Sequence, residues 1–458
     1  MPWSIGLRVG EHFADLVALN KEFYKRRFYY PQSNVEATLS ALLQELQVST
    51  VAKVRLYPNW PFEQSQSGQS DSAAVLITAG FENWLEMTMP LKTWHFTSEA
   101  RRPAMPIDRD LFLGVSERTN AQGQIEKPVD HTELEFLASK LQLHQIKDIA
   151  VCFLHSARNN ENEMRAKEFF ETKGFRVHLS CLQNGHDFHL MTDEKSRFLS
   201  TIVTARSFEP FLSRIKKIQS VFETLAPGET NLVFVGDHPL QEIADGRVPL
   251  LKAATSYYEK LSSSMAQDGP IFYAGYENFI LFAGRGERQK SWPSPFGPLA
   301  LATPSLFFPR IQPLSLLTKG FISPVEFSND IASHDLGPMV FGRGLVPTFF
   351  DLVALQMKPD DLQDVIPITD RRNERGRHHL VEQLAAHARN FTDDERLAGE
   401  TLADRLFVLG CEILQDEIRN HGLNKNLKIC GPLATALAQP LGGLSIIDEF
   451  EAFREWIG

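Results

Sequence analysis

A strand–helix–strand alternation between residues 149 and 179 is the feature that most restricts the fold of this chain. The apolar run 149–154 predicts a buried strand, residues 160–173 predict a polar helix, and residues 175–179 predict a second strand. Two strands joined by a helix are typical of a parallel α/β layer. We therefore expect an α/β protein, with a second lobe that begins near the helical stretch 206–225.

The composition is that of an ordinary globular protein, and it argues against several classes of function. Hydrophobic residues make up 43% of the chain and charged residues 23%, which argues against disorder. A net charge of -10 argues against a nucleic-acid-binding protein, since such proteins carry a basic face. The longest apolar runs fall short of the roughly 20 residues that a membrane span needs. We expect neither nucleic acid nor membrane as a partner.

The N-terminal segment and the cysteines indicate a cytoplasmic protein. The first residues lack the basic and then apolar pattern of a secretory signal. The four cysteines are scattered and form no C-x-x-C pair, which predicts buried thiols in a reducing compartment rather than a zinc site or a disulfide framework.

Signatures of the common catalytic classes are missing from the sequence. It contains no G-x-S-x-G nucleophile motif, no G-x-x-x-x-G-K-[ST] phosphate loop and no H-E-x-x-H zinc motif. His186 and His189 could hold a metal, but no other ligand cluster with a recognisable spacing accompanies them, so we expect a surface loop and no metal. The charged run 370–379, which contains a glycine, is expected to be an exposed loop.

Several short segments, taken in their order along the chain, resemble one family. Residues 5–17 (IGLRVGEHFADLV) resemble the opening I-G-I-D-V-G-G-T-F-T-D-L-V, and residues 149–156 are similar to v-A-V-c-l-l-h-S. Further segments match weakly but in the same order, at 77–86, 116–130, 159–163, 337–351 and 430–434. The ordered set, rather than any single segment, resembles the hydantoinase A / 5-oxoprolinase family.

The resemblance implies a two-lobed α/β architecture of the actin and sugar-kinase type, which is ribonuclease-H-like. Residues 1–205 would form the hydantoinase/oxoprolinase N-terminal-like domain. Residues 206–458 would form the hydantoinase A-like ATPase domain, shortened at its C-terminal end relative to the family. Family members couple ATP cleavage to opening or carboxylating small amides, lactams and ketones, usually with a partner subunit. The implied partner is a hydantoinase B-like or other family subunit.

The first phosphate-binding motif of the family is largely replaced in this chain. In the family, an aspartate on the first strand orients Mg²⁺ or the attacking water, and adjacent glycines let backbone N–H groups approach the phosphates. Here the aspartate position is Arg8, the second glycine is Glu11, and only Gly10 and Asp15 remain.

The second phosphate motif and the adenosine segment are altered in the same way. Residues 272–280 align with f-D-x-G-G-T-S-T-D, so that Tyr273 replaces the acid, Gly275 is kept and Tyr276 replaces the second glycine. The adenosine segment keeps only Gly431 and the Pro432 that follows it. These replacements oppose Mg–ATP chemistry at every motif that the family uses for it.

We therefore expect a catalytically degenerate family member that acts as a structural or regulatory subunit and uses no cofactor; no catalytic residue is predicted. One open alternative is an active ATP-dependent hydrolase of small cyclic amides or lactams, of the 5-oxoproline or hydantoin type, which would use ATP and Mg²⁺. A second alternative is a small-molecule-binding protein without ATPase activity.

Arg8 has three interpretations. A lone arginine is usually a solvated surface charge, and this is the first expectation. If the cleft is retained, Arg8 could instead pair with Glu11 or Asp15, or hold a carboxylate or phosphate ligand by charge-assisted hydrogen bonds. Of these two we favour internal pairing, because both acids lie within seven residues of Arg8. The strands 5–9 and 272–274 are expected in two different lobes that face one cleft.

Overall fold

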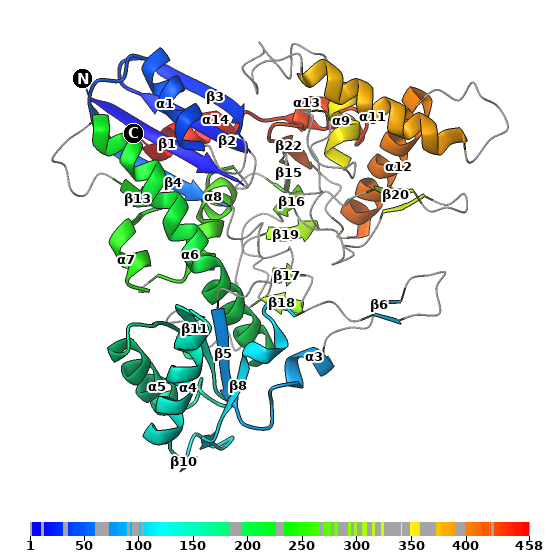
Figure 1. Cartoon of the computed structure of the whole chain (residues 1–458). Coiled ribbons are helices and arrows are strands. Elements are labelled where there is room, and N and C mark those ends of the chain that lie inside the picture. Colours follow the sequence, from blue (N-terminus) through cyan, green and yellow to red (C-terminus); the bar gives the residue numbers. More distant parts are fainter. Residues whose placement is uncertain are drawn as a thin grey trace. The chain divides into compact units, whose positions relative to one another are not determined.

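The computed structural model divides into two compact units, which are described separately (Figure 1). Unit 1 comprises residues Met1–Leu56, Tyr257–Glu287 and Pro304–Gly458, and unit 2 comprises Tyr57–Ser256 and Arg288–Thr303. The structure describes residues 2–10, 13–30, 35–59, 73–88, 92–93, 100–101, 105–183, 194–225, 233–246, 248–265, 269–275, 279–282, 292–294, 297–299, 305–308, 314–316, 322–324, 340, 349–357, 372–389, 399–420, 422 and 426–457.

Unit 2 is built on a parallel four-stranded sheet of order β12-β11-β5-β8. Its strands are β5 (Ala73–Thr78), β8 (Phe112–Val115), β11 (Asp148–Cys152) and β12 (Arg176–Leu179). Every residue of β5 and of β11 is buried, as expected for parallel strands with both faces covered. Since α5 (Glu161–Thr172) connects β11 to β12, the predicted strand–helix–strand unit is confirmed.

Two longer helices accompany this sheet. The helix α4 (His131–Leu143) begins after Asp130, whose side chain accepts a hydrogen bond from the Thr132 N–H and so caps the helix. The helix α6 (Glu194–Leu225) runs unbroken for 32 residues. The predicted domain division at 205/206 falls inside α6, and the compact units do not follow it; as a boundary between family segments it stays a prediction.

The other described elements of unit 2 are short: α3 (Trp84–Thr88), β6 (Lys92–Thr93), β7 (Ala100–Arg101), η1 (Arg109–Leu111), β9 (Arg118–Thr119), β10 (Ile125–Lys127), η2 (Ser180–Leu182), β13 (Val233–Val235), β14 (His238–Pro239), α7 (Leu240–Ala244), β17 (Trp292–Ser294) and β18 (Gly297–Leu299). The helix α8 (Leu250–Met265) contributes residues to both units.

The first sheet of unit 1 brings the N-terminal strands together with a helix from the other end of the sequence. The antiparallel strands β1 (Trp3–Val9), β2 (Phe13–Leu19) and β3 (Phe23–Tyr29) follow one another, with β4 (Val51–Pro58) beside β1. The helix α1 (Val35–Glu45) lies between β3 and β4 in the chain. From the other end of the sequence, α14 (Glu449–Ile457) packs on β1 and β2 and is drawn in red beside the blue strands in Figure 1.

Glycine at position 6 allows this close packing of α14. A Cβ atom on Gly6 would lie 2.6 Å from the Ile457 side chain and 2.6 Å from the Phe453 ring. Interiors are packed too densely to absorb such contacts without displacement, so the absence of a side chain on β1 is what lets the helix approach.

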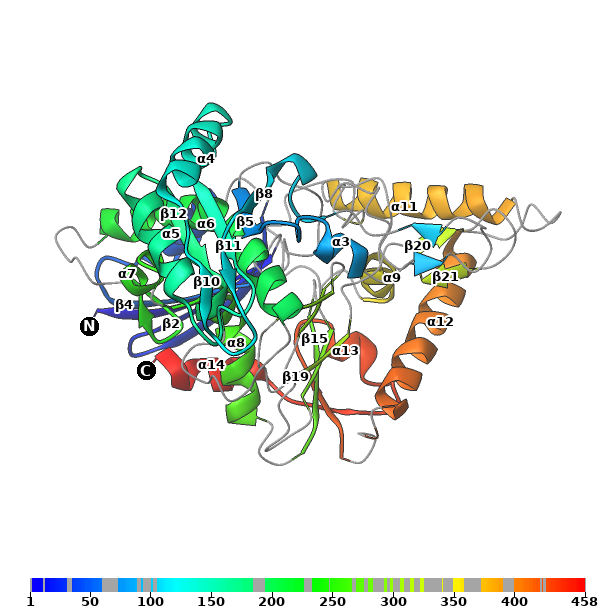
Figure 2. The same cartoon turned by 90° about the horizontal axis from the view of Figure 1, so that it is seen from below.

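The second sheet of unit 1 has the order β19-β16-β15-β22-β23. Its strands are β15 (Ile271–Ala274), β16 (Phe279–Phe282), β19 (Ser305–Phe308), β22 (Lys428–Cys430) and β23 (Ser445–Ile446). An apolar core joins this sheet to α9 (Phe349–Gln356), α11 (Arg372–Arg389), α12 (Gly399–Asn420) and α13 (Ala434–Leu437). The helices α11 and α12 contact each other, and Figure 2 shows α12 running at an angle to α11. The hairpin of β20 (Leu314–Leu316) and β21 (Ile322–Pro324) completes the described strands.

Two expectations about unit 1 are wrong. The charged run at 370–379 is not a loop, because α11 begins at Arg372; Leu380 and Leu384 bury that helix in the core, and this packing outweighs the helix-weakening glycine. The strands β1 and β15 do lie in different sheets, but both sheets belong to the same compact unit rather than to two lobes.

Candidate functional site

Arg8 lies inside unit 1 and pairs with Asp15. It sits on β1 directly opposite Asp15 on β2, and its Nη1 donates a hydrogen bond to Asp15 Oδ2 over 3.1 Å. The side chains of Arg8 and Asp15 are 0% and 1% exposed. The expectation of a solvated surface charge is therefore wrong, and the alternative of internal pairing is confirmed, with Asp15 as the partner.

Two further residues extend this pair into a buried ion network, defined as Arg8, Asp15, Arg27 and Glu449. On β3, Arg27 Nε donates to Asp15 Oδ1 over 3.1 Å, and its Nη2 forms an ion pair with Glu449 of α14. The network contains two cations and two anions, so its charges balance. Sequence reasoning missed Arg27 and Glu449, because they lie outside the matched segments and only the fold brings Glu449 to the N-terminal sheet.

Tyrosine rings enclose the Arg8 end of the network. The Arg8 guanidinium carbon lies 5.4 Å from the ring centroid of Tyr257 and 5.9 Å from that of Tyr273, within the range of a cation–π interaction. Burial by itself lowers the pKa of Arg8, but the neighbouring Tyr273, Tyr258 and Asp15 outweigh it and raise the pKa above its ordinary value. Tyr273 is itself completely buried, and burial raises the pKa of its hydroxyl. Arg8 and Tyr273 therefore meet in a packed interior rather than across an open cleft.

The structure brings the described glycines of the three motifs to the same unit. The Gly10 N–H donates to the Phe13 carbonyl over 2.8 Å, and the Gly10 carbonyl accepts a hydrogen bond from the Tyr30 hydroxyl. Gly275 and Pro432 are buried. Of the predicted positions, Glu11 and Tyr276 lie outside the described residues.

Gly431 links the adenosine segment to the other two motifs. Its N–H donates to Glu449 Oε2 over 3.0 Å, which attaches it to the buried ion network. Its φ of +99° favours glycine, and an added Cβ would lie 2.6 Å from the Ala274 carbonyl oxygen at the end of β15. The positions that matched three separate nucleotide motifs are thus joined by direct contacts.

The side chains at these positions do not suit a magnesium–phosphate group. Asp15 and Glu449 are the carboxylates of the network, and each is already paired with an arginine. A metal cation would have to displace a guanidinium from a fully buried carboxylate, which is strongly unfavourable. Among the described residues of both units, no group of three or more His, Cys, Asp or Glu side chains is arranged to hold a metal ion.

Unit 2 contains a second buried polar cluster, which the sequence did not single out as a site. Glu117, which follows β8, accepts hydrogen bonds from the Thr78 hydroxyl over 2.5 Å and from Asn162 Nδ2 over 2.8 Å. Glu163, which follows Asn162 in the chain, is 0% exposed. It accepts hydrogen bonds from the Phe153 N–H over 3.1 Å and from the Cys181 N–H over 3.0 Å. These residues fall within or beside the weakly matched segments 77–86, 116–130 and 159–163, which is the signal that could have identified them.

The carboxyls of this cluster are met by neutral donors rather than by cations. Ser180 Oγ also donates to Glu163 Oε1, over 2.6 Å. Burial raises the pKa of Glu163, and the hydrogen bonds from Ser180, Cys181 and Phe153 offset this only in part. Burial likewise raises the pKa of Glu117 against the opposing hydrogen bonds from Thr78 and Asn162. The carboxyl groups of Glu117 and Glu163 are therefore protonated more readily in this cluster than they would be in water.

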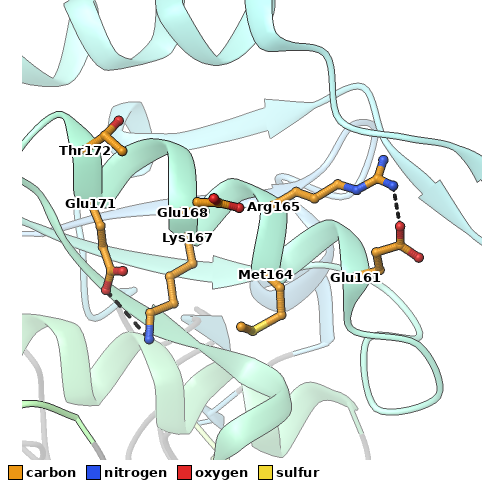
Figure 3. Close-up of a pocket in the computed structure, with 7 residues that line it drawn as sticks. All are labelled: Glu161, Met164, Arg165, Lys167, Glu168, Glu171 and Thr172. Carbon is orange, nitrogen blue, oxygen red and sulfur yellow. Dashed lines mark hydrogen bonds and ion pairs between the residues drawn. The ribbon is translucent and has the colours of Figure 1, made fainter.

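A surface hollow lies along the outer face of α5 (Figure 3). Its charged side chains pair along the helix itself, Arg165 with Glu161 and Lys167 with Glu171. All of its described lining residues come from this one helix: Glu161, Met164, Arg165, Lys167, Glu168, Glu171 and Thr172. Because active sites gather groups from several elements, we assign no function to this hollow.

Comparison with known sequences identifies a family region. Residues 5–174 match the family model described as the hydantoinase/oxoprolinase N-terminal region. A curated but uncharacterized protein of Methanocaldococcus jannaschii is 22% identical over 385 residues, which covers 75% of this chain and 55% of that protein. The chain thus spans little more than half the length of this relative.

Comparison with solved structures identifies the fold. A nucleotide-free acetone carboxylase matches with a TM-score of 0.63 at 15% identity, over 96% of this chain and 67% of that one. The ATP-dependent caprolactamase from Pseudomonas jessenii matches with a TM-score of 0.61 at 15% identity, over 99% and 70%. The predicted α/β fold of the actin type is confirmed. Within the described residues, no helix is both long and apolar enough to cross a membrane.

Proposed function

We propose that this chain is a catalytically degenerate member of the hydantoinase/oxoprolinase family that serves as a structural or regulatory subunit beside an active partner; the matched N-terminal region and the shared fold support this. It uses no cofactor of its own. The observation that carries this proposal is the buried Arg8, which stands at the family's acidic position and is fixed by Asp15 on one side and by tyrosine rings on the other.

Physical chemistry supports this assignment. Phosphoryl transfer depends on positioned metal ions and on free backbone donors at the phosphates. At the positions that matched the family motifs, a guanidinium replaces the acid, and a tyrosine packs where the second motif has another acid. The Gly431 N–H and the Gly10 N–H are both engaged by acceptors within the protein.

The direct test is titration of the purified chain with Mg–ATP by calorimetry, together with a phosphate-release assay. We expect no binding heat and no turnover above the buffer blank. As matched variants, Gly10→Val and Gly275→Val would abolish a genuine nucleotide activity but leave a contaminating ATPase unchanged. Turnover that survives purification and disappears in both variants would overturn the proposal and favour an active hydrolase.

The partner part of the proposal has its own test. We expect a hydantoinase B-like protein from the same genome to co-elute with this chain in size-exclusion chromatography without added nucleotide. Co-elution that requires ATP would contradict a nucleotide-independent subunit. Since this chain spans 55% of its curated relative, the comparison should be repeated with any longer form of the chain.

A further inference from the structure

The outer face of α4 carries an uncharged, partly apolar stripe, the α4 stripe, defined as Thr132, Phe136, Ser139 and Leu143. These positions recur at spacings of four, three and four residues, so they share one side of the helix. All four residues are exposed, and Phe136 and Leu143 are 70% and 82% exposed. The opposite side of α4 holds its buried residues, which are Leu134, Leu137, Ala138 and Leu141. The stripe is therefore not the face by which α4 packs on its own unit.

The composition of the stripe suits contact with another helix. A single exposed apolar side chain is common, but here two large ones lie on one helix face with no charged side chain between them on that face. Ser139 is small, so it leaves room for a side chain from an opposing helix. Its hydroxyl donates to the Glu135 carbonyl of the same helix over 3.0 Å, so burial of Ser139 would not leave this donor unsatisfied.

Two side chains of opposite charge flank the stripe on one side, Glu133 and Lys140. Both residues are half-buried, and a spacing of seven residues puts them about 10 Å apart along the helix axis, too far to pair with each other. Among the described residues neither has an ion-pair partner; the Glu133 carboxylate accepts from the Ser116 N–H. The flank therefore offers one cation and one anion to a partner that presents the same two charges in reverse order.

A second copy of α4 running antiparallel fits this face. A two-fold axis between positions 137 and 138 sets Phe136 against Ser139 of the second copy and Leu143 against Thr132 of the second copy, so each large side chain meets a smaller one. The same register brings Lys140 beside Glu133 of the second copy, and the two-fold axis repeats this ion pair. The face is thus complementary to itself in size and in charge.

We infer that this chain forms a two-fold homodimer through antiparallel pairing of its α4 stripes. The inference goes beyond the proposed function, which concerns a hydantoinase B-like partner and not the association of the chain with itself. Two helix faces of 13 residues each bury less than the roughly 1,600 Å² of a standard interface. The dimer is accordingly weak, with a Kd on the order of 10 µM.

Sedimentation equilibrium of the purified chain without nucleotide is the direct test, and we expect a reversible monomer–dimer equilibrium. Phe136→Glu should raise the Kd at least about tenfold, because it places two unpaired carboxylates in the apolar seam. The matched control is Val408→Glu, since Val408 is 54% exposed on α12 of unit 1; this variant should leave the Kd unchanged. Thermal denaturation of dilute samples checks that each variant folds.

Two results would overturn the inference. One is a chain that stays monomeric at a concentration of about 0.5 mM, where even weak dimers are populated. The other is an equal loss of dimer in Phe136→Glu and Val408→Glu.

A charge exchange tests the antiparallel register. Lys140→Glu and Glu133→Lys should each raise the Kd by roughly tenfold, because two attractive pairs become two repulsive ones. In an equimolar mixture of the two variants, a mixed dimer has opposite charges at both pairs, so we expect its Kd to return to the wild-type value. A mixture that associates no better than either variant alone would refute the register.

The hydantoinase B-like protein is the competing occupant of the stripe. If the wild-type chain is monomeric and Phe136→Glu abolishes co-elution with that protein, the stripe serves the partner; the homodimer is then overturned and the proposed function stands. If the chain is dimeric and hydrolyses Mg–ATP, the proposed function is overturned and the homodimer stands. The two statements can therefore fail independently.

Discussion

The buried ion network of unit 1 and the buried polar cluster of unit 2 each hold two carboxyl groups, and the two sites compensate them by different means. In unit 1, Asp15 and Glu449 face the guanidinium groups of Arg8 and Arg27. In unit 2, Glu117 and Glu163 face hydroxyl, amide and backbone N–H groups that carry no formal charge. Removing one partner of a buried charge pair strongly destabilises the fold, because the other charge is left buried and unpaired. A carboxyl group surrounded by neutral donors can instead take up a proton and remain buried without a charge.

The largest expected effect is on the charge-balanced network of unit 1. Arg8→Asp restores the residue of the family motif, but it removes the guanidinium that pairs with Asp15 and adds a third carboxylate to a network in which only Arg27 remains as a cation. We expect a loss of about 3–5 kcal/mol in the free energy of unfolding, measured by denaturant titration. We also expect no gain of ATPase activity, because the second glycines of both phosphate motifs remain replaced.

Two outcomes of this experiment would contradict the contrast drawn between the charged network of unit 1 and the neutral cluster of unit 2. An unchanged denaturation midpoint would show that the network contributes little to stability. A gain of ATP hydrolysis in Arg8→Asp would show that this one charge is what separates the chain from an active enzyme.

The second prediction compares two glycines with similar backbone angles, one in each unit. Gly431 has φ +99° and Gly80 has φ +88°, but an added Cβ would lie 2.6 Å from the Ala274 carbonyl oxygen at Gly431 and would meet no atom within 4 Å at Gly80. Gly80→Ala should lose about 1–2 kcal/mol through the left-handed backbone alone. Gly431→Ala should lose roughly 1–3 kcal/mol more through overpacking. Equal losses, measured by thermal denaturation, would mean that β15 moves freely away from Gly431.

The third prediction concerns pH and unit 2. Because burial raises the pKa of Glu163, the native state binds its proton more tightly than the unfolded state does. Its contribution to stability is complete below the unfolded pKa of about 4.3 and is lost as pH rises through the higher folded pKa. Glu163→Gln cannot titrate, so its stability should fall less over that pH range than the wild type's.

At low pH the same variant should lose about 1–3 kcal/mol, because the Gln amide nitrogen cannot accept a hydrogen bond from the backbone N–H groups that Glu163 satisfies. The matched control is Glu135→Gln, since Glu135 on α4 is 57% exposed. A pH profile of Glu163→Gln that parallels the wild type would show that Glu163 stays ionised throughout.

The smallest effect is expected for a charge pair on the surface of unit 1. Lys25 Nζ and Asp448 Oδ2 lie 2.5 Å apart, and both side chains are 45% exposed. Exposed pairs contribute about 0–1 kcal/mol, so Lys25→Ala should shift the denaturation midpoint only slightly. Since Arg27 lies two positions along β3 and pairs with Glu449, a loss comparable with that of Arg8→Asp would indicate that the surface and buried pairs act as one unit.

The sequence predicted those parts of the molecule whose signals are local. The parallel β11–α5–β12 unit follows from hydrophobic runs and a polar helix within thirty-odd residues. The Arg8–Asp15 pair follows from two charges on adjacent strands of a short hairpin. In each case neighbours in the sequence are also neighbours in space.

Contacts between distant segments were not predicted. Glu449 joins the network because α14 packs on the N-terminal sheet, and no periodicity in either segment indicates that pairing. The run 370–379 has the composition of a loop, and only the burial of the following leucines makes it a helix. Glu117 and Glu163 were overlooked because they look like ordinary surface acids until the fold encloses them.

The packing of α14 against β1 also sets the order in which the protein can be completed during its synthesis. Lys25 and Asp448 are 423 positions apart, so a ribosome needs roughly 20 to 80 s to travel between them. Throughout that interval Gly6 lacks the Phe453 and Ile457 side chains that pack on it, and Arg27 lacks its partner Glu449. The N-terminal sheet therefore exists first as a nascent intermediate with an uncovered apolar face, the kind of surface that chaperones bind on emerging chains.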